Sequence, residues 1–192
     1  MEKIVVYFML LAVLLFTGCK SKVKHYGIEA KGPSYSNLQE MEDESKVIVR
    51  VTREEYEKPV ITYNEGRMVS GYTFSKVKIE EIFKDTTNSL KVGDSIRILE
   101  NEVFSEKENA VYHIGGYNMM EEDEEYILFL NRDIYYDKEA YYVAKGTTFG
   151  TVPVEEDNRA TVYFDKDKNP VNSVSGAVNS IWEKALEKYK EK

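Results

Sequence analysis

Short runs of β-branched and aromatic residues, separated by turn-forming residues, fill most of the chain from residue 46 to residue 164. Val47–Thr52, Ser95–Glu100 and Tyr141–Ala144 are examples, and Val92-Gly93-Asp94 is typical of a turn into the second of them. β-Branched residues favour extended backbone, while glycine and aspartate favour tight turns. Further short strands are expected over residues 152–154 and 160–164. The sequence therefore predicts a mainly β domain.

Two of the predicted strands have special features. The run Val69–Phe83 is long, and its alternation slips over residues 80–83, which predicts a bulge or a strong bend. The run Tyr126–Leu130 is apolar on both faces, so we expect it to be the most buried strand. Between them, Gly115-Gly116 marks a place where the backbone needs flexibility or close approach. The long run places four residues on one face: Thr73, Ser75, Val77 and Ile79.

The end of the chain has a helical period instead. Glutamate and lysine occupy the positions between the apolar residues, which predicts an amphipathic helix over about 174–190. We expect this helix to cover the sheet, with Trp182 in its packing face. The apolar residues at helical spacing are Val174, Val178, Ile181, Ala185, Leu186 and Tyr189.

The start of the chain has the pattern of an export signal. Lys3 precedes an uninterrupted apolar run of 13 residues, Ile4–Phe16, which is too short for a helix that spans a bilayer. The sequence Phe16-Thr17-Gly18-Cys19 resembles the lipobox of bacterial lipoproteins, although Phe16 stands where leucine is usual. The resemblance implies a lipoprotein signal peptide over residues 1–18 and a diacylglycerol on Cys19. The mature protein would then be anchored to the cell membrane on its extracytoplasmic side.

Residues 19–45 contain little sustained pattern, and we expect a flexible tether there with His25 as a solvated side chain. The folded domain is then expected over residues 46–192. Cys19 is the only cysteine, so the chain cannot form an internal disulfide.

The order of strands and turns resembles that of uncharacterised lipoproteins of Gram-positive bacteria with an OB-like, netrin-module-like barrel. The residues that carry this resemblance are Val77–Phe83, Leu90–Ile98, Gly115-Gly116 and Glu124–Leu130. It implies a five-stranded OB-like barrel followed by the C-terminal helix. A small β-sandwich with a helix is the alternative fold. Tissue inhibitors of metalloproteinases share the broad fold, but their zinc-chelating N-terminal cysteine is not carried over to a lipidated Cys19.

Catalytic and cofactor signatures are weak in this sequence. No Gly-x-Ser-x-Gly or His-Glu-x-x-His pattern occurs, no cysteine remains as a nucleophile, and Gly115-Gly116 lacks the flanking residues of a phosphate loop. His113 is the only histidine in the predicted domain, and a core or rim imidazole with one backbone partner is the favoured interpretation. The net charge of −8 argues against a nucleic-acid partner. We therefore expect no enzymatic activity and no cofactor.

Two acidic segments have carboxylates that could attract a metal ion. Asp165-x-Asp167-x-Asn169 copies the opening of a calcium loop, but Pro170 replaces the required glycine and Gly176 stands where a bidentate glutamate belongs. The expectation is a polar turn, with these three residues as weak metal candidates only. The run of residues 121–125 is interpreted as a solvated acidic turn.

Fifteen tyrosines are an excess that suits molecular recognition. Tyr135-Tyr136 and Tyr141-Tyr142 are adjacent pairs, and neighbouring residues of a strand point to opposite faces, so one of each pair is expected to be exposed if the other is in the core. The alternative is structural: tyrosine favours strands and tolerates partial burial without any role in binding. We expect a lipid-anchored binding module that uses these tyrosines to recognise a protein or an envelope polymer. The open alternatives are a carboxylate-dependent enzyme on cell-envelope material, an inhibitor of an extracellular peptidase and, last, a solute receptor for a transporter.

Overall fold

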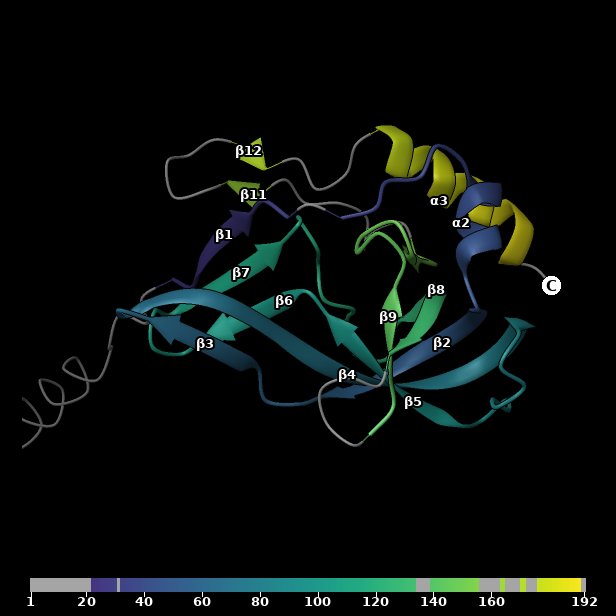
Figure 1. Cartoon of the computed structure of the whole chain (residues 1–192), viewed down its shortest axis with the longest axis horizontal. Coiled ribbons are helices and arrows are strands. Elements are labelled where there is room, and N and C mark those ends of the chain that lie inside the picture. The colour runs from purple at the N-terminus through teal and green to yellow at the C-terminus, as the bar shows by residue number, and fades with distance from the viewer. Residues whose placement is uncertain are drawn as a thin grey trace, which may run out of the picture.

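The computed structural model describes residues 22–30, 32–133, 139–155, 163–164, 170–171 and 176–190 (Figure 1). Two helices and twelve strands occur in this part of the chain. The elements are β1 (Lys24–Ile28), α2 (Leu38–Glu44), β2 (Val47–Tyr56), β3 (Val60–Asn64), β4 (Arg67–Asp85), β5 (Ser95–Glu100), β6 (Glu102–Ser105), β7 (Ala110–Ile114), β8 (Glu125–Asp133), β9 (Tyr141–Ala144), β10 (Thr151–Pro153), β11 (Tyr163–Phe164), β12 (Pro170–Val171) and α3 (Gly176–Tyr189).

Five strands close into a barrel in the order β2-β4-β5-β9-β8. All neighbouring pairs are antiparallel except β5 and β9, which run parallel. Pairing between β8 and β9 closes the ring, and this strand order is that of an OB-like barrel. The expected mainly β fold with a five-stranded barrel and a C-terminal helix is confirmed.

Apolar side chains at alternate positions of the strands point inward and fill the barrel. The predicted face of β4 is buried throughout, and β8 is buried on both faces from Tyr126 to Leu130, as its apolar sequence predicted. β10 pairs with residues 126–128 of β8, on the side of β8 that faces away from β2. The apolar interior consists of Val47, Val49, Val51, Val77, Ile79, Ile96, Ile98, Met120, Tyr126, Leu128, Leu130, Tyr142 and Ala144.

The 19 residues of β4 serve two parts of the fold. Its second half lies in the barrel, where two of the three shifts in the register with β2 fall beside residues 79–84 and confirm the expected irregularity. Its first half leaves the barrel and pairs with β3 as a two-stranded hairpin. Turn residues Glu65 and Gly66 join the two strands of this hairpin with positive φ angles of 47° and 81°.

A small second sheet, β1-β7-β6, packs against the hairpin. The Tyr63 and Ser105 hydroxyls lie 2.7 Å apart, and the Thr73 hydroxyl donates to the Glu102 carbonyl at 2.6 Å. β1 runs parallel to β7. Gly115-Gly116 follows β7 with φ angles of 65° and 70°, so the expected need for unusual backbone there is confirmed.

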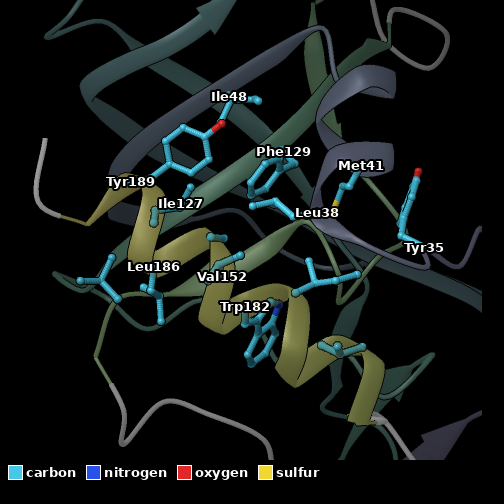
Figure 2. Close-up of a cluster of buried hydrophobic side chains, with 14 residues drawn as sticks. Tyr35, Leu38, Met41, Ile48, Ile127, Phe129, Val152, Trp182, Leu186 and Tyr189 are labelled. Atoms are coloured by element: carbon cyan, nitrogen blue, oxygen red, sulfur yellow. The ribbon is translucent and has the colours of Figure 1, made fainter.

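Helices α2 and α3 cover the outside of the barrel beside β8 and β10 (Figures 1 and 2). The apolar face of α3 packs onto Ile127 and Phe129 of β8 and Val152 of β10 in one buried cluster, and Trp182 lies within it as predicted. Glu42 of α2 joins the two helices, because its carboxylate accepts bonds from Lys188 at 2.8 Å and Tyr189 at 2.7 Å. No helix in the described ranges is long and apolar enough to cross a membrane.

The predicted flexible tether is wrong for much of its length. Residues 24–28 form β1, and α2 with the preceding Tyr35 belongs to the outer core. Leu38 and Met41 are buried on one face of this helix, whose first turn is capped by Asn37. The Glu40 carboxylate accepts a bond from the Ser36 amide at 2.9 Å. The spacing Asn37-x-x-Glu40 is typical of a helix N-terminus and could have indicated this helix.

Candidate functional site

One end of the barrel interior is polar. At this end, the inward-facing rows of β2, β4 and β5 carry Arg53, Ser75 and Glu100, all of which are buried. The Glu100 carboxylate is fully buried and accepts bonds from the Tyr117 hydroxyl at 2.9 Å and the Met120 amide at 2.8 Å. The Ser75 hydroxyl donates to its other oxygen. Burial of a carboxylate is tolerated here because several donors face it.

Burial changes the acidity of this carboxyl. It raises the pKa of Glu100 from 4.5 to about 7, although the hydrogen bonds from Ser75, Met120 and Tyr117 act in the opposite direction. The positive charge of Arg53 also lowers this pKa. Arg53 is only 4% exposed, and no hydrogen-bond acceptor within the described ranges faces its Nε or Nη2. Near neutral pH the Glu100 carboxyl therefore exists in both protonated and ionised forms.

A second polar cluster, centred on His113 and Glu102, lies next to Glu100. His113 of β7 is 2% exposed, and its Nδ1 lies 2.9 Å from a Glu102 oxygen and 3.0 Å from the Tyr117 carbonyl. Both of these neighbours are acceptors, so Nδ1 carries the hydrogen. His113 Nε2 lies 3.0 Å from Nδ1 of His25, and the two rings stack. Glu102 also accepts from the Met119 amide at 3.0 Å, beside the Met120 amide that binds Glu100.

The histidine predictions are confirmed in part. His113 is a core imidazole with a backbone partner, as expected, but it also contacts Glu102 and His25. His25 is exposed, yet it belongs to β1 and bonds to His113 instead of lying in a solvated tether. The two residues are 88 positions apart, and only the parallel pairing of β1 with β7 brings them together. No local sequence pattern could have indicated this contact.

An apolar groove of about 400 Å³ lies between the β3–β4 hairpin, the start of the barrel and the second sheet. Its half-buried apolar walls come from four different strands, and Asn101 and Ser70 add polar groups. Val69 lines the groove and is 58% exposed. The full lining is Ile28, Met68, Val69, Ser70, Gly71, Tyr72, Leu99, Asn101 and Ile114.

The groove adjoins the polar residues along the chain. Asn101 lies between Glu100 and Glu102, and Ile114 follows His113. Because alternate strand residues point to opposite faces, the buried Glu100 and His113 lie on the side opposite to the groove residues Leu99 and Ile114. The groove therefore offers a surface for binding, while Glu100 lies in the barrel interior behind it.

The predicted tyrosine surface is wrong for Tyr141 and Tyr142, which are 3% and 4% exposed. β9 closes the barrel, so one face of the strand points inward, where Tyr142 joins the core. On the other face, the Phe74 ring packs edge-on against Tyr141 at 5.2 Å between centroids. Tyr135 and Tyr136 lie outside the described residues.

The weak metal candidates Asp165, Asp167 and Asn169 also lie outside the described residues. Within the described ranges, no group of three or more histidine, cysteine, aspartate or glutamate side chains could hold a metal ion.

The comparisons with known proteins give no relative: no protein-family model matches the chain, and no curated protein matches it.

Proposed function

We propose that the protein is a lipid-anchored binding module on the extracytoplasmic side of the cell membrane. The observation that carries the binding role is the apolar groove lined by Ile28, Leu99 and Ile114. Its volume falls within the roughly 300–1,000 Å³ typical of ligand pockets. Mostly apolar walls with a few polar groups favour an apolar part of a protein or envelope component. The lipobox-like sequence ending in Cys19 supports the anchor.

Val69→Asp is expected to weaken capture of the binding partner at least tenfold. A carboxylate at the wall of the groove would have to lose water when an apolar group binds, which costs more than the ~1.4 kcal/mol of a tenfold change. Val69 is 58% exposed, so the fold should tolerate the substitution. The measurement is crosslinking in intact membranes, followed by quantification of each captured protein or polymer.

Val92→Asp is the matched control, because Val92 is 63% exposed but does not line the groove. We expect this variant to capture the same components as the unmodified chain. Equal capture by the Val69→Asp and Val92→Asp variants would exclude the groove as the binding surface.

Cys19→Ala is expected to release the protein from the membrane fraction, because Cys19 is the only residue that could accept the diacylglycerol. Two acyl chains give stable anchoring, whereas the remaining protein surface would bind reversibly. The measurement is the distribution between membrane and soluble fractions, with metabolic labelling by a fatty acid. Retention of both the label and the membrane location by the variant would contradict the anchor.

A carboxylate-dependent enzyme acting on envelope material is the second candidate, and the observation that favours it is Glu100. A carboxyl with a pKa of about 7 can act as a general acid near neutral pH. Glu100 is fully buried and bonded to Tyr117 and Met120, so substrate would reach it only if the structure around it opened. Turnover of envelope material by the unmodified chain that is lost in Glu100→Gln would favour this candidate over the binding module.

A further inference from the structure

Three segments far apart in sequence form one end of the molecule, which we call the anchor-proximal end: residues 22–24, 64–67 and 105–109. The Lys24 amide donates to the Asn109 carbonyl at 3.1 Å, and the Asn109 side chain donates to the Lys22 carbonyl at 3.4 Å. The bond between Tyr63 and Ser105 brings the hairpin turn to the same place. In Figure 1 this end lies opposite α2 and α3.

The anchor-proximal end is close to the proposed site of lipidation. Lys24, the first residue of β1, is five positions after Cys19 in the sequence. An extended chain spans at most ~3.3–3.6 Å per residue, so Lys24 lies within about 17 Å of Cys19. An anchor at Cys19 therefore holds this end of the domain near the bilayer, and α2 and α3 lie away from it.

The charge near Cys19 is opposite to that of the whole chain. No acidic residue occurs between Glu2 and Glu29, whereas lysines stand at positions 20, 22 and 24 of a chain with a net charge of −8. Lys22 and Lys24 are exposed. The turn 64–67 adds one cation, Arg67, and one carboxylate, Glu65. The turn 105–109 adds one cation, Lys107, and the carboxylates of Glu106 and Glu108.

Exposed apolar side chains accompany these lysines. Val23, between Lys22 and Lys24, is 42% exposed, and Phe104 of β6, which lies on the other side of β7 in the same sheet, is 40% exposed. Cations flanked by exposed apolar groups suit an interface with lipid headgroups, where charge and shallow apolar insertion act together.

The geometry points to a membrane-docking surface at the anchor-proximal end, with anionic phospholipid headgroups as the ligand. Lys22 and Lys24 contact the headgroups, Val23 inserts among them, and the hairpin turn 64–67 and the turn 105–109 face the bilayer. The acidic remainder of the chain is repelled from the same surface, so the domain stands end-on and its α2–α3 end points outward. This inference rests on the proposed anchor at Cys19.

The test attaches the chain to vesicles chemically, so its outcome does not depend on lipidation in cells. A chain of residues 19–192 has one cysteine and includes every described residue, and Cys19 can be coupled to a maleimide lipid. Hydrogen–deuterium exchange is then compared on vesicles of phosphatidylglycerol with phosphatidylcholine and on vesicles of phosphatidylcholine alone. We expect slower exchange of residues 22–24, 64–67 and 105–109 on the anionic vesicles only.

Substitution of the lysines measures their contribution. Each lysine near an anionic surface is worth about 1 kcal/mol, or roughly fivefold in the ratio of docked to undocked protein, so Lys22→Gln with Lys24→Gln should reduce that ratio roughly 25-fold. The matched control replaces Lys91 and Lys184, which are exposed and far from this end, and should leave the protection unchanged. High salt should abolish the difference between the two vesicle types.

Three outcomes would overturn the inference. Equal exchange on both vesicle types would exclude recognition of anionic lipid, and protection of α2 and α3 would show a different face on the bilayer. The uncoupled chain can also be mixed with soluble polyphosphate in the absence of vesicles. If polyphosphate protects these residues and the anionic vesicles do not, the lysines recognise an anionic polymer and not a membrane. Release of the Cys19→Ala variant from cell membranes tests only the anchor, so the two proposals can fail separately.

Discussion

Replacing Glu100 with glutamine is expected to remove a decrease in stability of about 3 kcal/mol that the unmodified protein undergoes between pH 4.5 and pH 7. The pKa of this carboxyl is 4.5 ordinarily and about 7 in the folded protein. Between these values the folded state keeps a proton that the unfolded state has released. The contribution of Glu100 to stability is therefore greatest below pH 4.5, decreases as the pH rises, and levels off above 7.

Glutamine can reproduce the protonated carboxyl at this position. Its oxygen can accept the bonds from the Tyr117 hydroxyl and the Met120 amide, while its amide group donates to the Ser75 hydroxyl, which can also accept. The variant should match the unmodified chain near pH 4 and exceed it above pH 7. The measurement is the free energy of unfolding in denaturant at a series of pH values, compared between the two proteins.

Glu106→Gln serves as the control, because Glu106 is an exposed glutamate in the turn after β6. Its stability curve should run parallel to that of the unmodified chain, since the many other carboxylates titrate equally in both proteins. If the Glu100→Gln curve is also parallel, burial does not raise the pKa of Glu100, and the second candidate function loses its main support.

Met41→Ala is expected to destabilise the protein by about 2–5 kcal/mol, the range for truncating a buried methionine. Met41 is fully buried in the cluster between α2, α3 and the barrel (Figure 2). The substitution removes its thioether and methyl group from this cluster and leaves a cavity. Alanine has a high helix propensity, so the loss reports packing and not the helix itself. The measurement is the free energy of unfolding in denaturant.

Asp43→Ala, on the exposed side of the same helix, is the matched control and should change stability by no more than about 0.5 kcal/mol. The pair of variants distinguishes a packed helix from a flexible tether. If Met41→Ala has as small an effect as Asp43→Ala, residues 38–44 do not contribute to the core in solution.

Local patterns in the sequence account for much of the fold. The alternation of β4, the apolar run of β8 and the helical spacing of α3 each depend on residues close together in the chain, and all three predictions are confirmed. A period of two or of 3.6 determines which side chains share a face, whatever the rest of the molecule does. The irregularity in β4 could be predicted for the same reason, because the alternation itself slips there.

The short elements α2 and β1 form only because they pack against other parts of the fold. α2 has seven residues and β1 has five, and elements of this length are marginal in isolation, so their burial against α3 and β7 decides whether they form. Their sequences are polar enough to resemble a tether. The helix cap at Asn37 was a usable signal, but β1 had none.

The mainly β composition of the domain, the inward faces of its long strands and the C-terminal helix could all be predicted from local patterns in the chain. The burial of both Tyr141 and Tyr142, the contact between His25 and His113, and the closed interior around Glu100 become visible only in the folded molecule. Each of these results depends on pairing between strands distant in sequence, such as β5 with β9 and β1 with β7. Burial and acidity follow from what the closed barrel brings together, and a periodic pattern within one strand carries no information about its neighbour.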